Sequence, residues 1–404
     1  MFLPFYVCSV KMNILFLLRS IGVGGVEVVT ATLANKFVAE GHNVAIFARE
    51  FRKTNLADRL SPQIHLYIGC GDNDCKENVD ALHKVYVKEN VQIVVNQWGL
   101  PYKPIRLARK AEKNHKVKII SFHHNDPATN GRLNAIELKL KENKSFLKKI
   151  LFMIQRKVYH TITSFSMRYT YDHSERFMVL SNSYLEHLRK FINVSEESKQ
   201  GVLTNPVTVD KGDYIYSQEK KEKSILFCGR LDNVQKCPVR VLEVWNNLSP
   251  KFKDWSLYFI GDGPDRSFLE HMAKEKNLQN VYFEGFQNPV EYYKKASILA
   301  MTSDFEGFPL VLAECMNFGV VPCVYNSFAA LHDIIQDKEN GLIIEKENGL
   351  FSSEKMAEEL SKIMHDESKL RAMAKAAVKT SENFSIDTIY DRWEKVLSEI
   401  TACS

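Results

Sequence analysis

Two carboxylates stand close to a predicted helix start in the segment DFEGFPLVLAE, residues 304–314. Pro309 suits the first position of a helix, so Glu306 is predicted on the preceding loop and Glu314 about one and a half turns into the helix. A charge on an otherwise apolar helix is costly unless it is paired. The pattern therefore favours two carboxylates that hold hydroxyl groups, one on a ribose and one on a second sugar, over an ordinary buried helix.

The same helix start offers backbone hydrogen-bond donors. Its first residues, Leu310 and Val311, carry N–H groups that have no acceptor inside the helix. Such groups, together with the helix dipole, attract anions and sugar hydroxyls. The helix start is therefore predicted to face the same ligand as the two carboxylates.

Cations that could face a diphosphate follow an earlier apolar run. The segment FCGRLDNVQK places Gly229, Arg230 and Lys236 between a predicted strand and a predicted helix. A glycine lets a ligand approach the backbone, and an arginine with a lysine six positions later supplies two positive charges. The alternative is an ordinary solvated loop, because arginine and lysine are common on surfaces.

Two further strand-to-helix turns have the same construction. FIGDGPD contains Gly261 and Gly263 before a helix that starts near Pro264, either because the turn needs small residues or because a ligand lies there. FEGFQNP offers backbone groups near Phe286 and Gln287 that could contact a nucleobase edge.

The first half of the chain offers two more candidates. The glycine-rich turn GVGGVE, with Gly24 and Gly25, lacks the spacing of a dinucleotide fingerprint but permits close approach of a phosphate or a hydroxyl-rich ligand. SFHHNDP places His123 and His124 at the end of a predicted strand, where they either face a ligand or simply cap the strand.

The elements that must position these residues alternate between short apolar runs and helix-length segments from Asn13 onwards. This alternation predicts a parallel sheet covered by helices on both faces. The pattern fails near Asn205 and Pro206 and then starts again, so we predict two doubly wound α/β domains, of the Rossmann type, at residues 12–208 and 209–384. In such domains ligands bind outside the carboxyl ends of the strands.

The two ends of the chain lie outside these domains. Residues 1–11 are predicted to be an N-terminal extension. Residues 385–404 are predicted to form a helix that packs either on its own domain or on the first one, since Ile389 and Trp393 recur at helical spacing.

The whole-chain composition excludes several classes. A length of 404 residues suits two domains, and a net charge of +5 is too small for a dedicated nucleic-acid-binding protein. No apolar run reaches the roughly 18–20 residues that cross a bilayer, and Lys11 interrupts the apolar start, which argues against a signal peptide. The eight cysteines contain no CxxC pair, so we expect reduced, mostly structural thiols in a cytoplasmic protein.

One basic segment, residues 139–157, could meet an anionic membrane surface, or it could be a solvated basic helix. Apolar side chains interleave its seven cations, which are Lys139, Lys141, Lys144, Lys148, Lys149, Arg156 and Lys157.

Between Ser224 and Ile344 the motifs GRL with Lys236, GDGP, FEGF and EGFPLVLAE resemble, in order and approximate spacing, those of the retaining glycosyltransferases of family 4. The resemblance extends over most of the chain from Met12. It implies the GT-B architecture, in which two Rossmann-like domains face a central cleft, and a helix around Trp393 that returns to the first domain.

This resemblance also implies roles for the candidate residues. Arg230 and Lys236 would bind the diphosphate of a nucleotide sugar, and Glu314 would bind its ribose. Glu306, with the backbone from Gly307 through Phe308 to Leu310, would hold the transferred sugar. The remaining contacts would come from the Gly24–Gly25 turn, near phosphate or acceptor, and from a first-domain histidine, placed at His124 with His123 as the alternative, near the donor sugar.

The implied activity is transfer of a sugar, with retention of configuration and without a metal or other cofactor, from a nucleotide sugar such as a UDP-sugar. The implied acceptor is a saccharide or a lipid-linked saccharide in cell-surface polysaccharide, lipopolysaccharide or capsule synthesis, at the inner face of the cytoplasmic membrane. Two alternatives are a sugar-nucleotide epimerase or hydrolase on the same architecture, and a non-catalytic sugar-nucleotide-binding subunit.

Overall fold

The computed structural model describes residues 11–22, 24–51, 56–71, 74–143 and 145–402. The chain divides into two compact units. The first unit comprises Met1–Pro206 together with Ile386–Ser404, and the second comprises Val207–Ser385. The predicted N-terminal extension falls, apart from Lys11, outside the described residues.

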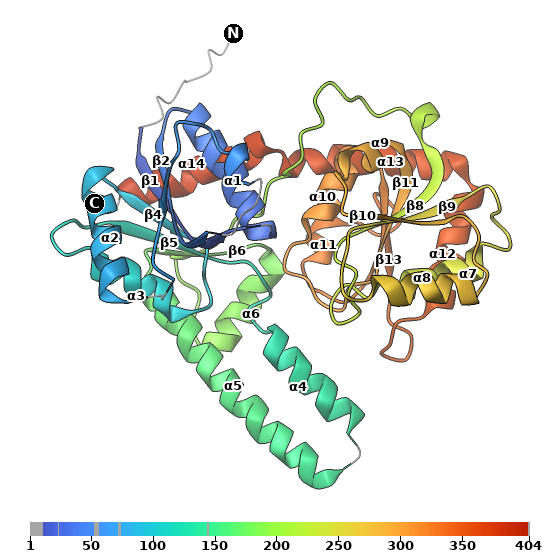
Figure 1. The fold of residues 1–404 in the computed structure, drawn as a ribbon, viewed down its shortest axis with the longest axis horizontal. Coiled ribbons are helices and arrows are strands. Elements are labelled where there is room, and N and C mark those ends of the chain that lie inside the picture. Colours follow the sequence, from blue (N-terminus) through green and yellow to red (C-terminus); the bar gives the residue numbers. More distant parts are fainter. Residues whose placement is uncertain (1–10, 23, 52–55, 72–73, 144, 403–404) are drawn as a thin grey trace. The chain divides into compact units, whose positions relative to one another are not determined.

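The first unit contains a seven-stranded sheet in the order β3-β2-β1-β4-β5-β6-β7 (Figure 1). Every paired neighbour runs parallel. The central strands are almost continuously apolar, because helices cover both faces of the sheet. The strands are β1 (Asn13–Ile21), β2 (Asn43–Phe51), β3 (His65–Ile68), β4 (Ile93–Asn96), β5 (Lys118–His123), β6 (Arg176–Val179) and β7 (Gln200–Val202).

Six helices of the first unit follow its strands or connect them. They are α1 (Gly25–Ala39), α2 (Lys76–Lys88), α3 (Tyr102–Ala111), α4 (Gly131–Glu142), α5 (Phe146–Asp172) and α6 (Asn182–Ile192), with a short 3₁₀ turn, η1 (Ala57–Arg59). Helices α4 and α5 form a pair that projects from the body of this unit (Figure 1).

The last helix of the chain, α14 (Ile386–Ala402), also belongs to the first unit. Its Trp393 packs against Phe37 of α1 and Phe122 of β5, with ring centroids 5.4 and 5.1 Å apart. The Tyr390 hydroxyl lies 2.8 Å from His42 Nε2. The apolar face that the helical spacing indicates is therefore buried on α1 and β5.

The second unit contains a six-stranded parallel sheet in the order β10-β9-β8-β11-β12-β13. Its strands are β8 (Glu222–Cys228), β9 (Ser256–Ile260), β10 (Val281–Gly285), β11 (Ala296–Met301), β12 (Val321–Tyr325) and β13 (Leu342–Ile344). The helices are α7 (Pro238–Leu248), α8 (Arg266–Glu275), α9 (Val290–Lys295), α10 (Leu310–Asn317), α11 (Leu331–Ile334), α12 (Ser353–His365) and α13 (Glu367–Ser381), with 3₁₀ turns η2 (Gln218–Lys220) and η3 (Glu382–Phe384). Both units thus confirm the predicted fold class.

Candidate active site

The candidate residues of the second unit gather where two neighbouring strands end. Strands β8 and β11 pair in parallel, so their carboxyl ends lie at the same edge of the sheet. The loop after β8 carries Gly229, Arg230 and Lys236, and the loop after β11 carries Glu306. Ligands of doubly wound domains bind at this edge.

Lys236 and Glu306 meet directly. The Lys236 ammonium donates a hydrogen bond of 2.7 Å to Glu306 Oε1, and Glu306 is only 9% exposed. The two loops are also joined by their backbones, because the Asp304 N–H donates to the Gln235 carbonyl at 2.8 Å. A lysine and a carboxylate from separate loops are thus fixed side by side, where they can hold a phosphate and a sugar hydroxyl respectively.

Arg230 lies on the same loop but is turned to solvent. Its Nε donates to Asp232 at 2.5 Å, and the side chain is 62% exposed. Asp232 is buried and also accepts from the N–H groups of Val234 and Gln235, at 3.1 and 2.9 Å. Asp232 therefore shapes the loop and restrains the guanidinium, whose remaining N–H groups can reach an anion.

Glu314 lies inside α10 and is 7% exposed. Thr208 Oγ1 donates to one carboxylate oxygen at 2.5 Å, and the Tyr293 hydroxyl donates to the other at 3.4 Å. These hydroxyls supply the partners that a buried charge needs. Carboxylate oxygens accept hydrogen bonds from hydroxyl groups, which is the chemistry that a ribose diol would need from Glu314.

Helix α10 begins one residue later than the sequence predicts, because Pro309 precedes the helix instead of forming its first position. Pro309 is the N-cap, and the helix begins at Leu310. Leu310 and Val311 are partly exposed, whereas Gly307 is buried. The Phe308 ring is also buried and packs on Phe384 at 5.5 Å, so only the Phe308 backbone can serve a ligand.

The glycines at this edge have a steric role in the ligand-free chain. A Cβ on Gly263 would lie 2.3 Å from the Leu231 carbonyl oxygen, and a Cβ on Gly261 would lie 2.0 Å from that of Gly229. Gly229 itself has a φ of +158°. Close backbone packing between the two loops therefore explains Gly261 and Gly263 without a ligand. Phe286, on the loop after β10, is 76% exposed.

In the first unit, two neighbouring strands bring His124 to Gln97. Strands β4 and β5 pair in parallel, and each of these residues follows the end of its strand. His124 Nε2 and Gln97 Oε1 lie 2.7 Å apart. With this oxygen as acceptor, Nε2 carries the proton, and the buried Nδ1, which has no hydrogen-bond partner among the described residues, keeps a lone pair for a substrate hydroxyl.

Both histidines are held in the neutral form. Burial lowers the pKa of His124 to about 3, and the charge of His123 adds to this shift. Burial lowers the pKa of His123 to about 4, against a smaller opposing effect of Asp126. His123 is almost fully buried, whereas His124 is partly exposed, so His124 is the better placed to reach a ligand.

The glycine-rich turn forms the start of α1. Gly24 is the N-cap and Gly25 the first helical residue. A Cβ on Gly24 would lie 2.4 Å from Glu27 Oε2, and Glu27 Oε1 accepts a hydrogen bond of 3.2 Å from Ser20. Gly24 therefore leaves room for the Glu27 carboxylate, which lies against the start of α1.

Gln97 is the residue that the sequence-based analysis missed. It follows the apolar run VQIVVN, and polar residues directly after a buried strand are the signal by which the histidines were found. Gln97 carries the same signal, because it directly follows β4, the strand before β5 in the sequence.

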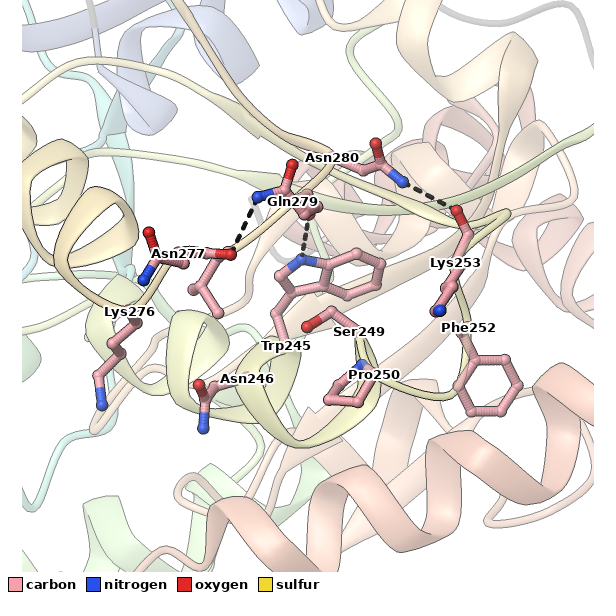
Figure 2. A pocket seen from close by; sticks show the side chains of 11 residues that line it. Trp245, Asn246, Ser249, Pro250, Phe252, Lys253, Lys276, Asn277, Gln279 and Asn280 are labelled. Carbon is pink, nitrogen blue, oxygen red and sulfur yellow. Dashed lines mark hydrogen bonds between the residues drawn. The ribbon is translucent and has the colours of Figure 1, made fainter.

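A pocket of about 470 Å³ lies elsewhere in the second unit (Figure 2). Its walls come from the end of α7 and from the loop that precedes β10, which is the opposite edge of the sheet from Lys236. Side-chain N–H groups hold these loops together: the Trp245 indole Nε1 donates to the Gln279 carbonyl at 3.0 Å, and the Asn280 amide donates to the Lys253 carbonyl at 3.0 Å (Figure 2). This pocket is not part of the candidate site.

Two doubly wound units, with polar side chains on the loops that follow their strands, define a class of α/β proteins that bind ligands at the carboxyl edges of their sheets. Two family models then cover most of the chain. Residues 23–211 match the model described as Glycosyltransferase Family 4, and residues 214–380 match the model described as Glycosyl transferases group 1. The chain belongs to glycosyltransferase family 4.

Curated relatives carry related names. A Campylobacter jejuni GalNAc-alpha-(1->4)-GalNAc-alpha-(1->3)-diNAcBac-PP-undecaprenol alpha-1,4-N-acetyl-D-galactosaminyltransferase is 25% identical over 96% of this chain and 99% of its own. An uncharacterized glycosyltransferase of Haemophilus influenzae is 30% identical over 44% of this chain, and the match spans about half (49%) of that relative.

Solved structures share the fold. A glycosyltransferase from Rickettsia africae superposes with a TM-score of 0.73 at 16% identity, covering 97% of this chain and 100% of that one. Anabaena Alr3699/HepE, solved in complex with UDP and glucose, superposes with a TM-score of 0.70 at 14% identity, covering 96% and 100%. The neighbours are GT-B glycosyltransferases, so the chain has the GT-B fold.

Proposed function

We propose that this protein transfers a sugar from a nucleotide sugar, most simply a UDP-sugar, to a saccharide or lipid-linked saccharide acceptor, with retention of configuration. The observation that carries this proposal is the contact between Lys236 and Glu306 on two loops at the carboxyl edge of the second sheet. It places a cation for a diphosphate beside a carboxylate for a sugar.

The donor is held by the second unit. Lys236 and Arg230 bind the diphosphate, and the Glu314 carboxylate accepts hydrogen bonds from the ribose hydroxyls. Glu306 and the backbone from Gly307 to Leu310 hold the transferred sugar. The choice of uridine is supported by two neighbours of the same fold, whose structures contain UDP.

The second unit also carries the chemistry. As the sugar–phosphate bond breaks, negative charge grows on the leaving diphosphate, and Lys236, Arg230 and the N-terminus of α10 stabilise it. The acceptor hydroxyl attacks from the same face and gives its proton to the leaving phosphate, which retains the configuration. Glu306 is engaged by Lys236 and positions the sugar instead of acting as a covalent nucleophile.

The first unit faces the acceptor and the sugar. His124 Nδ1 accepts a hydrogen bond from a donor-sugar hydroxyl, and the Gly24–Gly25 turn lies near phosphate or acceptor. A lipid-linked acceptor is supported by the printed name of the Campylobacter relative, whose substrate is carried on undecaprenol diphosphate.

We propose that the enzyme acts at a membrane surface, to which it binds through α5. Eight large apolar side chains of α5 are exposed, and six of them follow one face of the helix, the α5 stripe: Leu147, Leu151, Ile154, Val158, Ile162 and Phe165. At 100° per residue, Lys148 and Lys157 flank this stripe on either side. The helix contains no acidic residue before Asp172, which suits an anionic lipid surface at the inner face of the cytoplasmic membrane.

The basic segment differs from its expected form, since it does not form one helix. Asn143 ends α4 and Ser145 caps α5, so the segment spans the end of one helix and the start of the next. Arg156 forms an ion pair with Glu137 of α4, so it is not one of the cations that we expect to contact lipid. No helix among the described residues is long and apolar enough to cross a membrane.

The proposed function is tested with a panel of nucleotide sugars. Binding is followed by thermal shift, and transfer is followed by nucleoside diphosphate release with and without a lipid-diphosphate-linked saccharide. We expect one UDP-sugar to stabilise the protein and diphosphate release to require the acceptor. EDTA should leave the rate unchanged, because Lys236 and Arg230 supply the positive charge.

Release of diphosphate without any acceptor would favour a hydrolase, and donor binding without turnover would favour a binding subunit. The stereochemistry of the product, read by NMR of the anomeric proton, tests retention separately.

A further inference from the structure

Two cysteines that lie five positions apart in the sequence meet at the start of α2. The Sγ atoms of Cys70 and Cys75 are 3.1 Å apart. A disulfide bond is about 2.05 Å long, so an approach of about 1 Å would join them. We propose that Cys70 and Cys75 are a redox-active thiol pair, which exchanges with low-molecular-weight disulfides such as glutathione disulfide to form an intramolecular disulfide.

The backbone on both sides of the pair is anchored. The Cys70 N–H donates to Asn78 Oδ1 at 2.9 Å, and Asn78 is fully buried in α2. Cys75 is the N-cap of α2, and its sulfur accepts from the Asn78 N–H at 3.5 Å. One buried asparagine therefore holds both cysteines, and their proximity does not depend on the bond itself.

A second anchor lies beside Cys75. Asp74 forms ion pairs with Arg106 and Lys110 of α3, at 2.5 and 3.4 Å. These contacts tie the residue before Cys75 to the neighbouring helix. Such preorganisation makes closure of the disulfide an intramolecular step with a high effective concentration.

Exposure decides the order of the two exchange steps. Cys70 is exposed and Cys75 is partly buried. The Cys70 thiolate attacks glutathione disulfide, which forms a mixed disulfide and releases one glutathione thiolate. The Cys75 thiol then loses its proton and attacks the Cys70 sulfur, which releases the second glutathione. In total, two protein thiols lose two hydrogens and glutathione disulfide gains them.

The surroundings of Cys75 favour the second step. The Asn78 N–H lowers the pKa of Cys75, but the Cys70 thiol raises it, and the net shift is upward while both thiols are reduced. Once Cys70 is in a mixed disulfide, this opposing thiol is gone and the N-terminus of α2 stabilises the Cys75 thiolate. The Cys75 proton passes to solvent, because the backbone hydrogen bond that lowers the pKa of Glu77 makes this neighbouring carboxylate a poor base.

The other described cysteines are poorly suited to exchange. Cys237, Cys315 and Cys323 are buried, and burial raises the pKa of Cys228 to about 11. Among the cysteines that the structure describes, Cys70 is the exposed one. The pair therefore differs from the remaining described thiols in both access and proximity.

The sequence offers a direct assay. Cys70 and Cys75 share one tryptic peptide, residues 60–76, because Arg59 and Lys76 are the flanking cleavage sites. The EDTA-treated full chain is equilibrated in glutathione buffers of graded ratio, quenched with acid, alkylated with iodoacetamide and digested. We expect a peptide that is lighter by two hydrogen atoms and carries no alkyl group.

Matched variants distinguish the pair from a general thiol effect. Cys70→Ser and Cys75→Ser should lose this peptide and carry glutathione on the remaining cysteine, whereas Cys228→Ser should behave as wild type. Asp74→Asn should need roughly two- to fivefold more glutathione disulfide, the equivalent of a lost surface ion pair.

Full alkylation of both cysteines in an excess of glutathione disulfide would overturn the proposal. Protection from alkylation that requires added Zn²⁺ and disappears with EDTA would also overturn it, because the cluster with Glu77 would then be a metal site.

Discussion

At the scale of single residues, Lys236 must divide its hydrogen bonds between Glu306 and a diphosphate. An ammonium has three donors, and the contact of 2.7 Å to Glu306 uses one. The other two can meet phosphate oxygens without breaking this contact. The ion pair is therefore compatible with donor binding, and it fixes the lysine before the donor arrives.

Replacing Lys236 should expose this double role. We expect Lys236→Ala to lower kcat/KM for the donor by on the order of 100-fold, as for other removed charge-stabilising donors. Lys236→Arg should retain more activity than Lys236→Ala. Lys274→Ala, an exposed lysine of α8, is the matched control and should leave kcat/KM unchanged. A thermal melt accompanies each assay, because Glu306 loses its partner in the alanine variant.

Gln97 is a positioning residue for His124, and a pH profile tests this role. The Gln97 oxygen fixes the tautomer that leaves Nδ1 as an acceptor. Gln97→Leu should lower kcat/KM about tenfold. Gln97→Glu keeps an acceptor but places a negative charge beside the ring, so it should raise the pKa of His124 and move the acid limb of the pH–rate profile upward. An unchanged limb in Gln97→Glu would contradict the contact.

The buried His123 should make stability pH-dependent. Its pKa in the folded chain is about 4, below the ordinary value of about 6.5. Between these values the unfolded chain binds a proton and the folded chain does not, so acidification favours unfolding. Full stability is present above about pH 6.5.

The comparison is between wild type and His123→Gln in urea unfolding at several pH values. As the pH falls from 6.5 toward 4, the wild type should lose on the order of 1 kcal/mol per pH unit more than the variant. Equal slopes for both proteins would show that His123 is protonated in the folded chain.

At the scale of elements, short apolar runs mark the six strands of the second sheet but not two strands of the first. Long apolar runs mark buried strands, and each strand of the second unit has one. The missed strands, β3 and β7, lie at the two edges of the first sheet and have no fully buried residue. Strand β7 (QGV) contains a single apolar residue, and β3 offers only a short apolar run after His65, so neither gives a clear signal.

The candidate site, too, could be predicted only in part from the sequence. Residue types and strand ends predicted the loops of Lys236 and Glu306, because the carboxyl edge of a parallel sheet is fixed by topology. The hydroxyl partners of Glu314 could not be predicted in this way. Thr208 lies 106 positions away in the chain, and only the folded structure brings it to α10.

The α5 stripe makes a prediction about a whole helix face. Lys148→Gln with Lys157→Gln should weaken binding to vesicles containing anionic lipid by about 30-fold, since each lysine near such a surface contributes about 1 kcal/mol. Cosedimentation with vesicles measures this loss. Lys253→Gln with Lys274→Gln, which removes the same charge from the second unit, should have little effect. An equal loss in both double variants would indicate that net charge, and not the stripe, drives binding.

At the scale of the whole molecule, the first unit is built from two separate stretches of the chain, with the second unit between them in the sequence. The chain leaves the first unit at Pro206, forms the second unit, and returns with α14 to cover α1 and β5. Trp393 is almost completely buried there. The first unit therefore depends on a helix that is made last, whereas the second unit is continuous in sequence.

This topology predicts different behaviour for the two units when they are separated. Residues 207–385 should fold alone, with a cooperative melt and dispersed amide NMR signals, because their sheet and helices are all local to this stretch.

Residues 11–206 alone would expose Phe37 and Phe122 to water and should bind a hydrophobic dye and aggregate. Adding the α14 peptide, residues 386–402, should restore the fold, whereas the same peptide with Trp393→Ala should bind several kcal/mol more weakly because the largest buried side chain is missing. If residues 11–206 instead fold with the same stability in the presence and absence of the peptide, α14 does not contribute to the core of the first unit.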